Sequence, residues 1–143
     1  MTDALKVLII EDDPDIVLGC EQALQLEGIA CESVGSAEQA RRRLSRDFAG
    51  IVVSDIRLPR MDGMAFLREL VAMDAELPVV LITGHGDISM AVQAMKDGAQ
   101  DFIQKPFAPE TLVGAVRRAL ERRRLVLEVR ALRQQLDQRD SLE

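Results

Sequence analysis

The segment at residues 51–59 constrains the fold more than any other part of the sequence. Its apolar run Ile51-Val52-Val53 has no polar alternation, which is typical of a strand buried on both faces in a parallel sheet covered by helices. The run ends at Asp55, and Pro59 cannot continue a strand ladder. Ligand crevices of open α/β sheets lie at the carboxyl ends of the strands. Asp55 is therefore a candidate functional residue, although an Asp standing alone there would more often be a turn residue.

Four other short apolar runs alternate with segments of helical spacing. The predicted strands cover residues 6–10, 29–34, 51–55, 78–82 and 101–104, and the predicted helices cover residues 14–27, 36–46, 64–73, 87–98 and 109 onward. Asp13 and Pro14 begin the first helix as N-cap and first helical residue. Residues 36–39 form a capping box, and Asp87 is expected to cap the fourth helix. The pattern predicts an α/β fold, a doubly wound five-stranded parallel sheet with helices on both faces.

Polar side chains follow the predicted strands at one edge of this sheet. They are Asp12 and Asp13 after the first strand, Asp55 after the third, Thr83 after the fourth and Lys105 after the fifth. Carboxylates 4 Å apart repel by about 4 kcal/mol per pair at an effective dielectric constant near 20, which favours a bound cation. A few hard oxygen ligands suit Mg²⁺. Beside such a metal a carboxylate can attack an activated phosphoryl group, with a lysine and a hydroxyl assisting.

Composition narrows the class of protein. The chain has 143 residues, enough for one domain, and 48% of them are hydrophobic, which excludes a disordered chain. No apolar run approaches the roughly 18 residues of a membrane span, and the N-terminus lacks the features of a signal peptide. We therefore expect a cytoplasmic protein in which Cys20 and Cys31 are reduced core thiols.

Charge and spacing set the tail apart from the body. Residues 1–116 carry ten basic and nineteen acidic side chains, whereas residues 117–143 carry eight basic and five acidic ones. An acidic body argues against direct binding of nucleic acid, and the arginines at 122–124 are expected on a solvated face or in ion pairs between subunits. A coiled-coil seam of about two heptads is predicted in the tail, formed by Leu125, Val129, Leu132 and Leu136. We therefore divide the chain into a globular domain at residues 1–121 and a helical coiled-coil linker at residues 122–143.

These motifs resemble the receiver domain of two-component response regulators over about residues 5–121. The resemblance rests on their order and spacing, in Asp12-Asp13, Ser54-Asp55, Pro59, Met61-Asp62-Gly63, Thr83 and Lys105-Pro106-Phe107. It implies a flavodoxin-like receiver in which Asp55 accepts a phosphoryl group from a phosphohistidine of a sensor histidine kinase. It also implies that Asp13, Asp55 and the main-chain carbonyl of Arg57 hold Mg²⁺, while Asp12 acts through metal-bound water. Such a domain is a signalling phosphoacceptor that catalyses only its own phosphorylation and dephosphorylation.

The same resemblance assigns roles around the site. Thr83 and Phe102 would form the switch that reports phosphorylation, and Arg57 and His85 would stand at the rim and tune the lifetime of the phosphate. The Lys105–Pro106 peptide bond is expected to be cis. A homodimer is expected through the linker and through the face of the fourth helix, fifth strand and fifth helix.

Several alternatives remain open for the output and the function. Residues 83–99 and 128–133 look like receivers of the nitrogen-regulation and dicarboxylate-transport activators, which carry an AAA+ ATPase and a DNA-binding domain and act on sigma-54. Receivers with a simpler helix-turn-helix output share the Thr-Gly-His-Gly segment. A haloacid-dehalogenase-like phosphatase also uses Asp, Mg²⁺ and Lys, but places its nucleophile after the first strand. A receiver-shaped dimerisation scaffold that is never phosphorylated is disfavoured by the intact acidic site.

Overall fold

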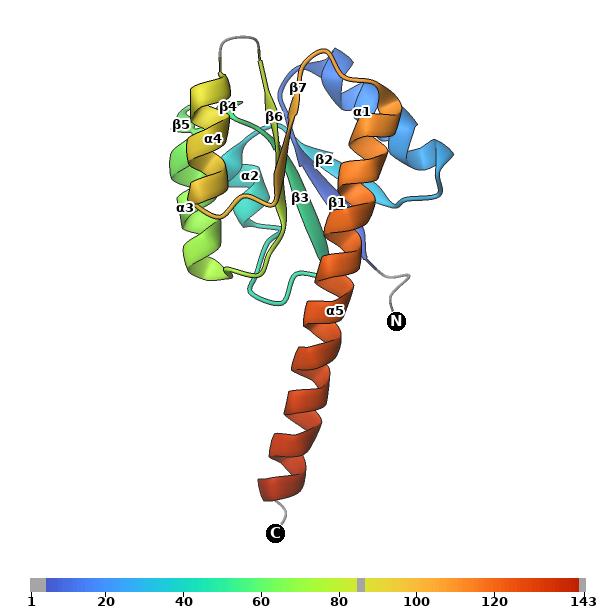
Figure 1. Cartoon of the computed structure of the whole chain (residues 1–143), viewed down its shortest axis with the longest axis vertical. Helices are drawn as coiled ribbons and strands as arrows, with labels where there is room; N and C mark the ends of the chain where they lie inside the picture. The colour runs from blue at the N-terminus through green and yellow to red at the C-terminus, as the bar shows by residue number, and fades with distance from the viewer. Residues whose placement is uncertain (1–4, 85–86, 142–143) are drawn as a thin grey trace.

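A five-stranded parallel sheet forms the centre of the molecule in a computed structural model that describes residues 5–84 and 87–141. The strand order is β2-β1-β3-β6-β7 (Figure 1). The strands are β1 (Lys6–Ile10), β2 (Cys31–Val34), β3 (Gly50–Asp55), β6 (Val79–Thr83) and β7 (Asp101–Gln104). A separate two-stranded hairpin, β4 (Arg57–Leu58) and β5 (Met61–Asp62), follows β3.

Helices cover both faces of the sheet, as the sequence predicts. They are α1 (Pro14–Leu26), α2 (Ala37–Arg41), α3 (Gly63–Met73), α4 (Ile88–Lys96) and α5 (Pro109–Ser141). In Figure 1, α1 and α5 lie on one side of the sheet and α2, α3 and α4 on the other. None of the helices in the described part of the chain is both long enough and apolar enough to cross a membrane.

Two apolar cores result, because successive residues of a strand point to opposite faces of the sheet. Leu8 and Ile10 of β1 join the core under α2, α3 and α4. Val7 and Ile9 join the core under α1 and α5, which also contains Cys20. The side chain of Cys20 is buried and its thiol is free, and burial raises the pKa of this thiol to about 11.

The helix starts follow local capping chemistry. Asp13 caps α1 by accepting a hydrogen bond from the Asp15 amide at 2.9 Å, with Pro14 at the first helical position. Ser36 caps α2, but the Gln39 side chain accepts from the Gly35 amide and not from that of Ser36, so the predicted capping box is shifted by one residue.

The second helix is shorter than predicted. We expected it to reach residue 46, but α2 ends at Arg41. The loop that follows is held by tertiary contacts that sequence spacing does not reveal: the carbonyls of Arg46 and Phe48 accept hydrogen bonds from Arg123 of α5. A helix continuing through these residues would use such carbonyls internally.

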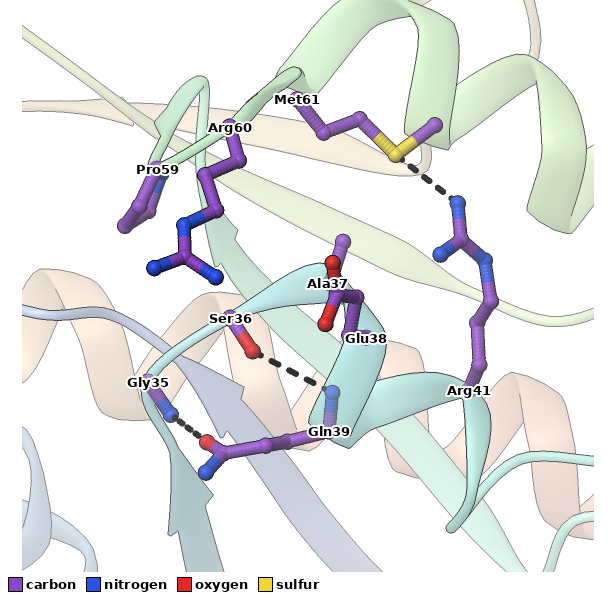
Figure 2. Close-up of a pocket in the computed structure, with 9 residues that line it drawn as sticks. All are labelled: Gly35, Ser36, Ala37, Glu38, Gln39, Arg41, Pro59, Arg60 and Met61. Atoms are coloured by element: carbon purple, nitrogen blue, oxygen red, sulfur yellow. Dashed lines mark hydrogen bonds between the residues drawn. The ribbon is translucent and has the colours of Figure 1, made fainter.

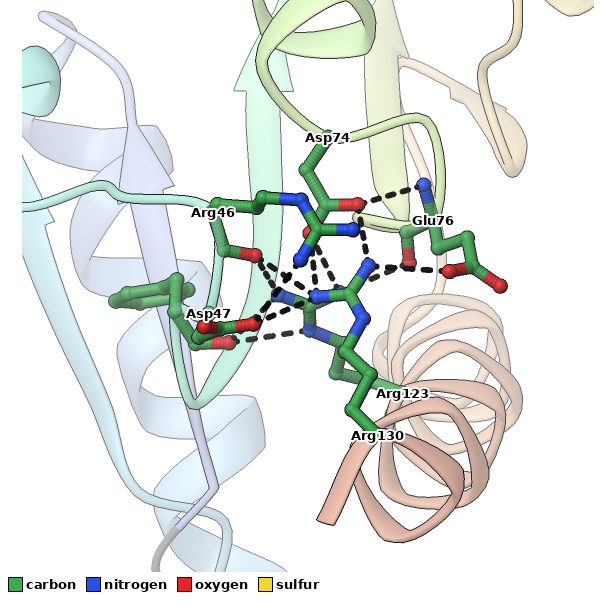
Figure 3. A network of polar contacts seen from close by, with 7 residues as sticks. Arg46, Asp47, Asp74, Glu76, Arg123 and Arg130 are labelled. Carbon is green, nitrogen blue, oxygen red and sulfur yellow. Dashed lines mark hydrogen bonds and ion pairs between the residues drawn. The ribbon is translucent and has the colours of Figure 1, made fainter. Parts of the chain in front are cut away.

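Arg123 is fully buried near the middle of α5, which corrects the expectation of a solvated arginine. Its guanidinium donates to the main-chain oxygens of Arg46, Phe48 and Glu76 and forms an ion pair with Asp74 at 2.9 Å (Figure 3). A buried charge is tolerated only when it is paired and hydrogen-bonded, and these contacts meet that requirement.

Arg130, two helical turns further along α5, completes this network, which we call the arginine clamp (Arg123, Arg130 and Asp74). Its guanidinium contacts Asp74 at 2.7 Å, Asp47 at 2.9 Å and Glu76 at 3.1 Å. Burial opposes ionisation of Asp74, but hydrogen bonds from Arg130, the Glu76 amide and Arg123 outweigh it and lower the pKa of Asp74 to about 2. The stabilisation from this carboxylate is therefore present above its unfolded pKa and lost as the pH falls toward 2.

We predict that Asp74→Asn lowers the free energy of unfolding by about 3–5 kcal/mol, because it leaves the buried Arg123 charge without a counter-ion. Urea denaturation followed by circular dichroism measures the change. Glu27→Gln is the matched control: it breaks the Arg117–Glu27 pair, whose side chains are 57% and 43% exposed, and should cost less than about 1 kcal/mol. Equal effects of the two substitutions would contradict the prediction.

Candidate functional site

The register of the sheet brings four strand ends together. Ile10 of β1 pairs with Ser54 of β3, so Glu11 and Asp55 follow side by side. On the other side, Thr83 of β6 pairs with Gln104 of β7, and the Lys105 amide donates to the Thr83 carbonyl at 2.7 Å. The strand order reverses between β1 and β3, which is the point where ligands bind in doubly wound sheets.

Side-chain alternation decides which of these residues share a face. Ile9, Val53 and Ile103 all belong to the core under α1 and α5. Two residues further along each strand stand Glu11, Asp55 and Lys105, which therefore point to the same face. This alternation places an acidic pair and a lysine together on one face at the carboxyl edge of the sheet.

The geometry of this group is that of an acidic pair sharing one cation. Lys105 Nζ lies 2.8 Å from Asp55 Oδ2 and 3.4 Å from Glu11 Oε1. Glu11 is 2% exposed and Asp55 is 7% exposed. Burial, and then the neighbouring Asp55 carboxylate, raise the pKa of Glu11 to about 7. Burial works against the charge of Lys105, but hydrogen bonding to Asp55 outweighs it, so the pKa of Lys105 is raised.

The acidic residues after β1 are not arranged as the sequence reading assumed. The expected pair was Asp12 and Asp13, but Asp13 is exposed and its carboxylate caps α1. Asp12 is also exposed, and Glu11, which the sequence analysis did not single out, is the buried acid beside Asp55. The signal that could have identified Glu11 is its position directly after the last buried residue of β1, in line with Asp55.

The oxygen donors at this edge suit Mg²⁺, although three acidic side chains do not already surround one point. Within residues 5–84 and 87–141, no group of three or more His, Cys, Asp or Glu side chains is placed to hold a metal ion. Glu11 and Asp55 nevertheless form a buried acidic pair that a cation would relieve, and exposed Asp12 adjoins them. Because Mg²⁺ keeps several waters and takes few carboxylates, this donor set fits the ion.

Thr83 and Phe102 lie on the other face of the sheet from the acidic pair. Thr83 is fully buried, and its hydroxyl lies 3.5 Å from the carbonyl of Ile103. Phe102 is half-buried and packs against the core under α2, α3 and α4. A switch through these two residues would therefore operate on the side of the sheet that α4 covers.

The rim of the site contains Arg57 and the segment after Lys105. The Arg57 amide donates to Asp55 Oδ1 at 3.0 Å, which fixes the main chain of Arg57 beside the Asp55 carboxylate. The Lys105–Pro106 peptide bond is cis. His85, the other expected rim residue, lies outside the described residues.

The β4–β5 hairpin is positioned next to this rim by close packing. Gly63 begins α3, and a Cβ atom there would overlap the main-chain carbonyl of Ile56. The turn of the hairpin is formed by Pro59 and Arg60, with Arg60 at a φ of 63°.

Two surface pockets border these elements. One, of about 560 Å³, lies between the start of α2 and the β4–β5 hairpin (Figure 2). Its polar lining residues Ser36, Gln39 and Arg41 are engaged in helix capping and in the pairing of Arg41 with Glu69, so this part of the pocket has a structural role. The second, of about 510 Å³, runs between α1 and the segment after β7; its lining includes Ile16, Ala23, Phe107 and Lys105 of the acidic site.

Comparisons with known proteins agree on one family. The model of the response regulator receiver domain matches residues 7–117. The C4-dicarboxylate transport transcriptional regulatory protein DctD of Rhizobium meliloti is 55% identical over 133 residues, which cover 93% of this chain and 29% of that protein. The response regulator protein TodT of Pseudomonas putida is 39% identical over 122 residues, covering 85% of this chain and 54% of that protein.

Solved structures show the same relationship. The response regulator StyR superposes with a TM-score of 0.87 and 32% identity, over 95% of this chain and 69% of StyR. The chain thus spans less than a third of DctD and about half of TodT.

We predict that the metal-free protein loses stability as the pH rises from about 5 to 8, because the raised pKa of Glu11 favours the folded state only while this carboxyl is protonated. Glu11→Gln should flatten this decline. The free energy of unfolding in urea, measured at several pH values with a chelator present, tests it. Glu110→Gln, at an exposed position on α5, is the control and should behave like the wild type; identical pH profiles for all three proteins would contradict the prediction.

Proposed function

The chain belongs to the response regulator receiver domain family, and from that premise we propose that Asp55 accepts a phosphoryl group from a sensor histidine kinase. The observation that carries the proposal is the position of Lys105 Nζ, 2.8 Å from Asp55 Oδ2 at the carboxyl edge of the sheet. An amino group at this distance can stabilise the oxygens of an incoming phosphoryl group.

The transfer is a displacement at phosphorus. An Asp55 carboxylate oxygen forms the new P–O bond while the P–N bond of the phosphohistidine breaks, and the imidazole leaves with the bonding electrons and takes up a proton. The product on Asp55 is an acyl phosphate. Lys105 balances the charge that gathers on the phosphoryl oxygens, and the buried position of Asp55 limits access of water.

Receiver domains generally use Mg²⁺ for phosphorylation, and this chain offers a definite set of ligands. We assign the ion to the carboxylates of Glu11, Asp12 and Asp55 with the main-chain carbonyl of Arg57, and we remove Asp13 from the set because its carboxylate caps α1. When bound, the ion would offset the negative charge shared by acids and phosphate.

The kinase partner is expected at the groove between α1 and the segment after β7. Its lining combines apolar side chains with Lys105, so a docked helix could bury an apolar stripe and still present a phosphohistidine to Asp55. A cytoplasmic location accompanies this proposal, because the kinase draws its phosphoryl group from ATP in that compartment.

Dimerisation is proposed through α5 and α4. The predicted seam is exposed: Leu125, Val129, Leu132 and Leu136 are 44–60% accessible. At 3.6 residues per turn these side chains project roughly 140° away from Arg123 and Arg130, so the arginine clamp faces the body while the seam faces outward. Two heptads are marginal alone, and a second apolar stripe on α4, Ile88, Val92 and Met95, is also exposed.

An output domain beyond this segment is proposed from the relatives. DctD is a transcriptional regulatory protein much longer than this chain, and the resemblance of residues 83–99 favours an AAA+ output acting on sigma-54. A simple helix-turn-helix output is the second candidate, because receivers with that output share the Thr-Gly-His-Gly segment at residues 83–86. None of the reported relatives supports the phosphatase alternative.

We predict that acetyl phosphate with Mg²⁺ labels the wild type at Asp55 and does not label Asp55→Asn, as mapped by mass spectrometry of peptides. Asp12→Asn should slow labelling at least about tenfold through weaker metal binding. Asp13→Asn is the matched control, because asparagine caps a helix as well as aspartate does, and it should label at the wild-type rate. A label elsewhere in the chain would overturn the proposed function.

We predict that Leu132→Lys weakens the dimer at least about tenfold, because a buried leucine contributes about 1.5–3 kcal/mol to an apolar interface. Sedimentation equilibrium over a concentration series measures the dissociation constant. Gln134→Lys adds the same charge to the opposite side of α5 and should leave association unchanged. Equal dissociation constants for both variants would rule out the seam as the interface.

A further inference from the structure

The side chain of Arg57 pairs with Asp87 and not with Asp55, although the main chain of Arg57 lies beside Asp55. Its guanidinium donates to both carboxylate oxygens of Asp87, Nη2 to Oδ1 at 2.7 Å and Nε to Oδ2 at 3.1 Å. This hydrogen bonding raises the pKa of Arg57 and lowers the pKa of Asp87. The segment that follows Asp55 is thereby tied to the beginning of α4.

Asp87 occupies the N-cap position of α4 without capping it. Its main chain is not extended, with φ −101° and ψ 19°, and its side chain makes no capping hydrogen bond. The N-caps of α1, α2 and α3 are all extended, and each accepts a hydrogen bond from an amide of the first turn. The Asp87 carboxylate differs from them in being held by Arg57.

This ion pair is placed to be exchanged. The side chain of Arg57 is 72% exposed, whereas that of Asp87 is 7% exposed. Arg57 can therefore turn to another anion, but the buried Asp87 carboxylate then needs a new hydrogen-bond donor. The helix that it holds is lightly attached, since the buried residues of α4 are the small Ala91 and Ala94. A change at the first turn of α4 therefore needs little repacking.

We propose that Arg57 exchanges its partner Asp87 for the phosphoryl group on Asp55, and that the released Asp87 then caps α4. The proposal rests on phosphorylation of Asp55. A phosphoryl group offers more negative charge and more acceptor oxygens than one carboxylate, and guanidinium binds such groups in a two-pronged manner. Arg57 is close enough to Asp55 for the carboxylate already to contribute to its raised pKa.

The exchange links the chemistry to the exposed face of α4. With Arg57 turned toward Asp55, the Asp87 carboxylate is free to accept from amides of the first turn of α4, as Asp13 does in α1. The stripe of Ile88, Val92 and Met95 would move with that turn. Arg57 thus acts as a positioning residue that transmits the event at Asp55 to the surface proposed for dimerisation.

Amide hydrogen exchange of the first turn of α4, read by mass spectrometry at equal labelled fraction, tests the proposal. In the wild type, labelling with acetyl phosphate and Mg²⁺ should slow exchange there about fivefold, the factor expected of one cap. In Arg57→Gln, exchange should already be slow without label and should not change on labelling. In Asp87→Ala, it should stay fast in both states although Asp55 accepts the label.

Arg68→Gln is the matched control, because Arg68 pairs with Asp97 at the other end of α4 at 3.5 Å. It should respond to labelling as the wild type does. If Arg57→Gln or Asp87→Ala also responds as the wild type does, the partner exchange is overturned while the proposed function stands. If the wild type takes no label, the proposed function itself fails.

Discussion

The site depends on one charge relation: two buried carboxylates, Glu11 and Asp55, face a single amino group, that of Lys105. Two carboxylates face one ammonium group, and burial together with the neighbouring Asp55 carboxylate raises the pKa of Glu11. Apolar packing holds it in place, because the residues two positions before each of these three lie in one core. The acids therefore cannot separate without displacing strands, and the remaining negative charge makes the edge receptive to a cation.

The sheet, the helices on its two faces and the positions of Asp55, Thr83 and Lys105 could be predicted because apolar runs and strand ends are local signals. Glu11 could not be separated from Asp12 and Asp13 in the same way. Three consecutive acids leave a choice that only the register of β1 against β3 decides. The sequence did contain one constraint on that choice, since Asp13 before Pro14 is a helix cap and its carboxylate is engaged.

The arginine clamp was missed for a different reason. The arginines at 122–124 look alike in sequence, but Arg123 alone of these three is fully buried. A signal existed: Val116, Arg123 and Arg130 follow one another at spacings of seven, so the two arginines continue the inner stripe of α5. What the spacing could not supply was the partner, because Asp74 and the Phe48 carbonyl come from loops distant in sequence.

The two ends of the sheet differ in how firmly they hold the helices beside them. At the amino edge, α5 is fixed by a buried arginine with several main-chain acceptors, and moving it would expose an unpaired charge. At the carboxyl edge, α4 begins at an ion pair between the exposed Arg57 and the buried Asp87, and it buries mainly alanines. A perturbation at Asp55 will deform the weaker attachment, so α4 is the element that can respond while the direction of α5 is maintained. In the proposed dimer, the linker would then provide a constant axis, and phosphorylation of Asp55 would act through the face that α4 presents.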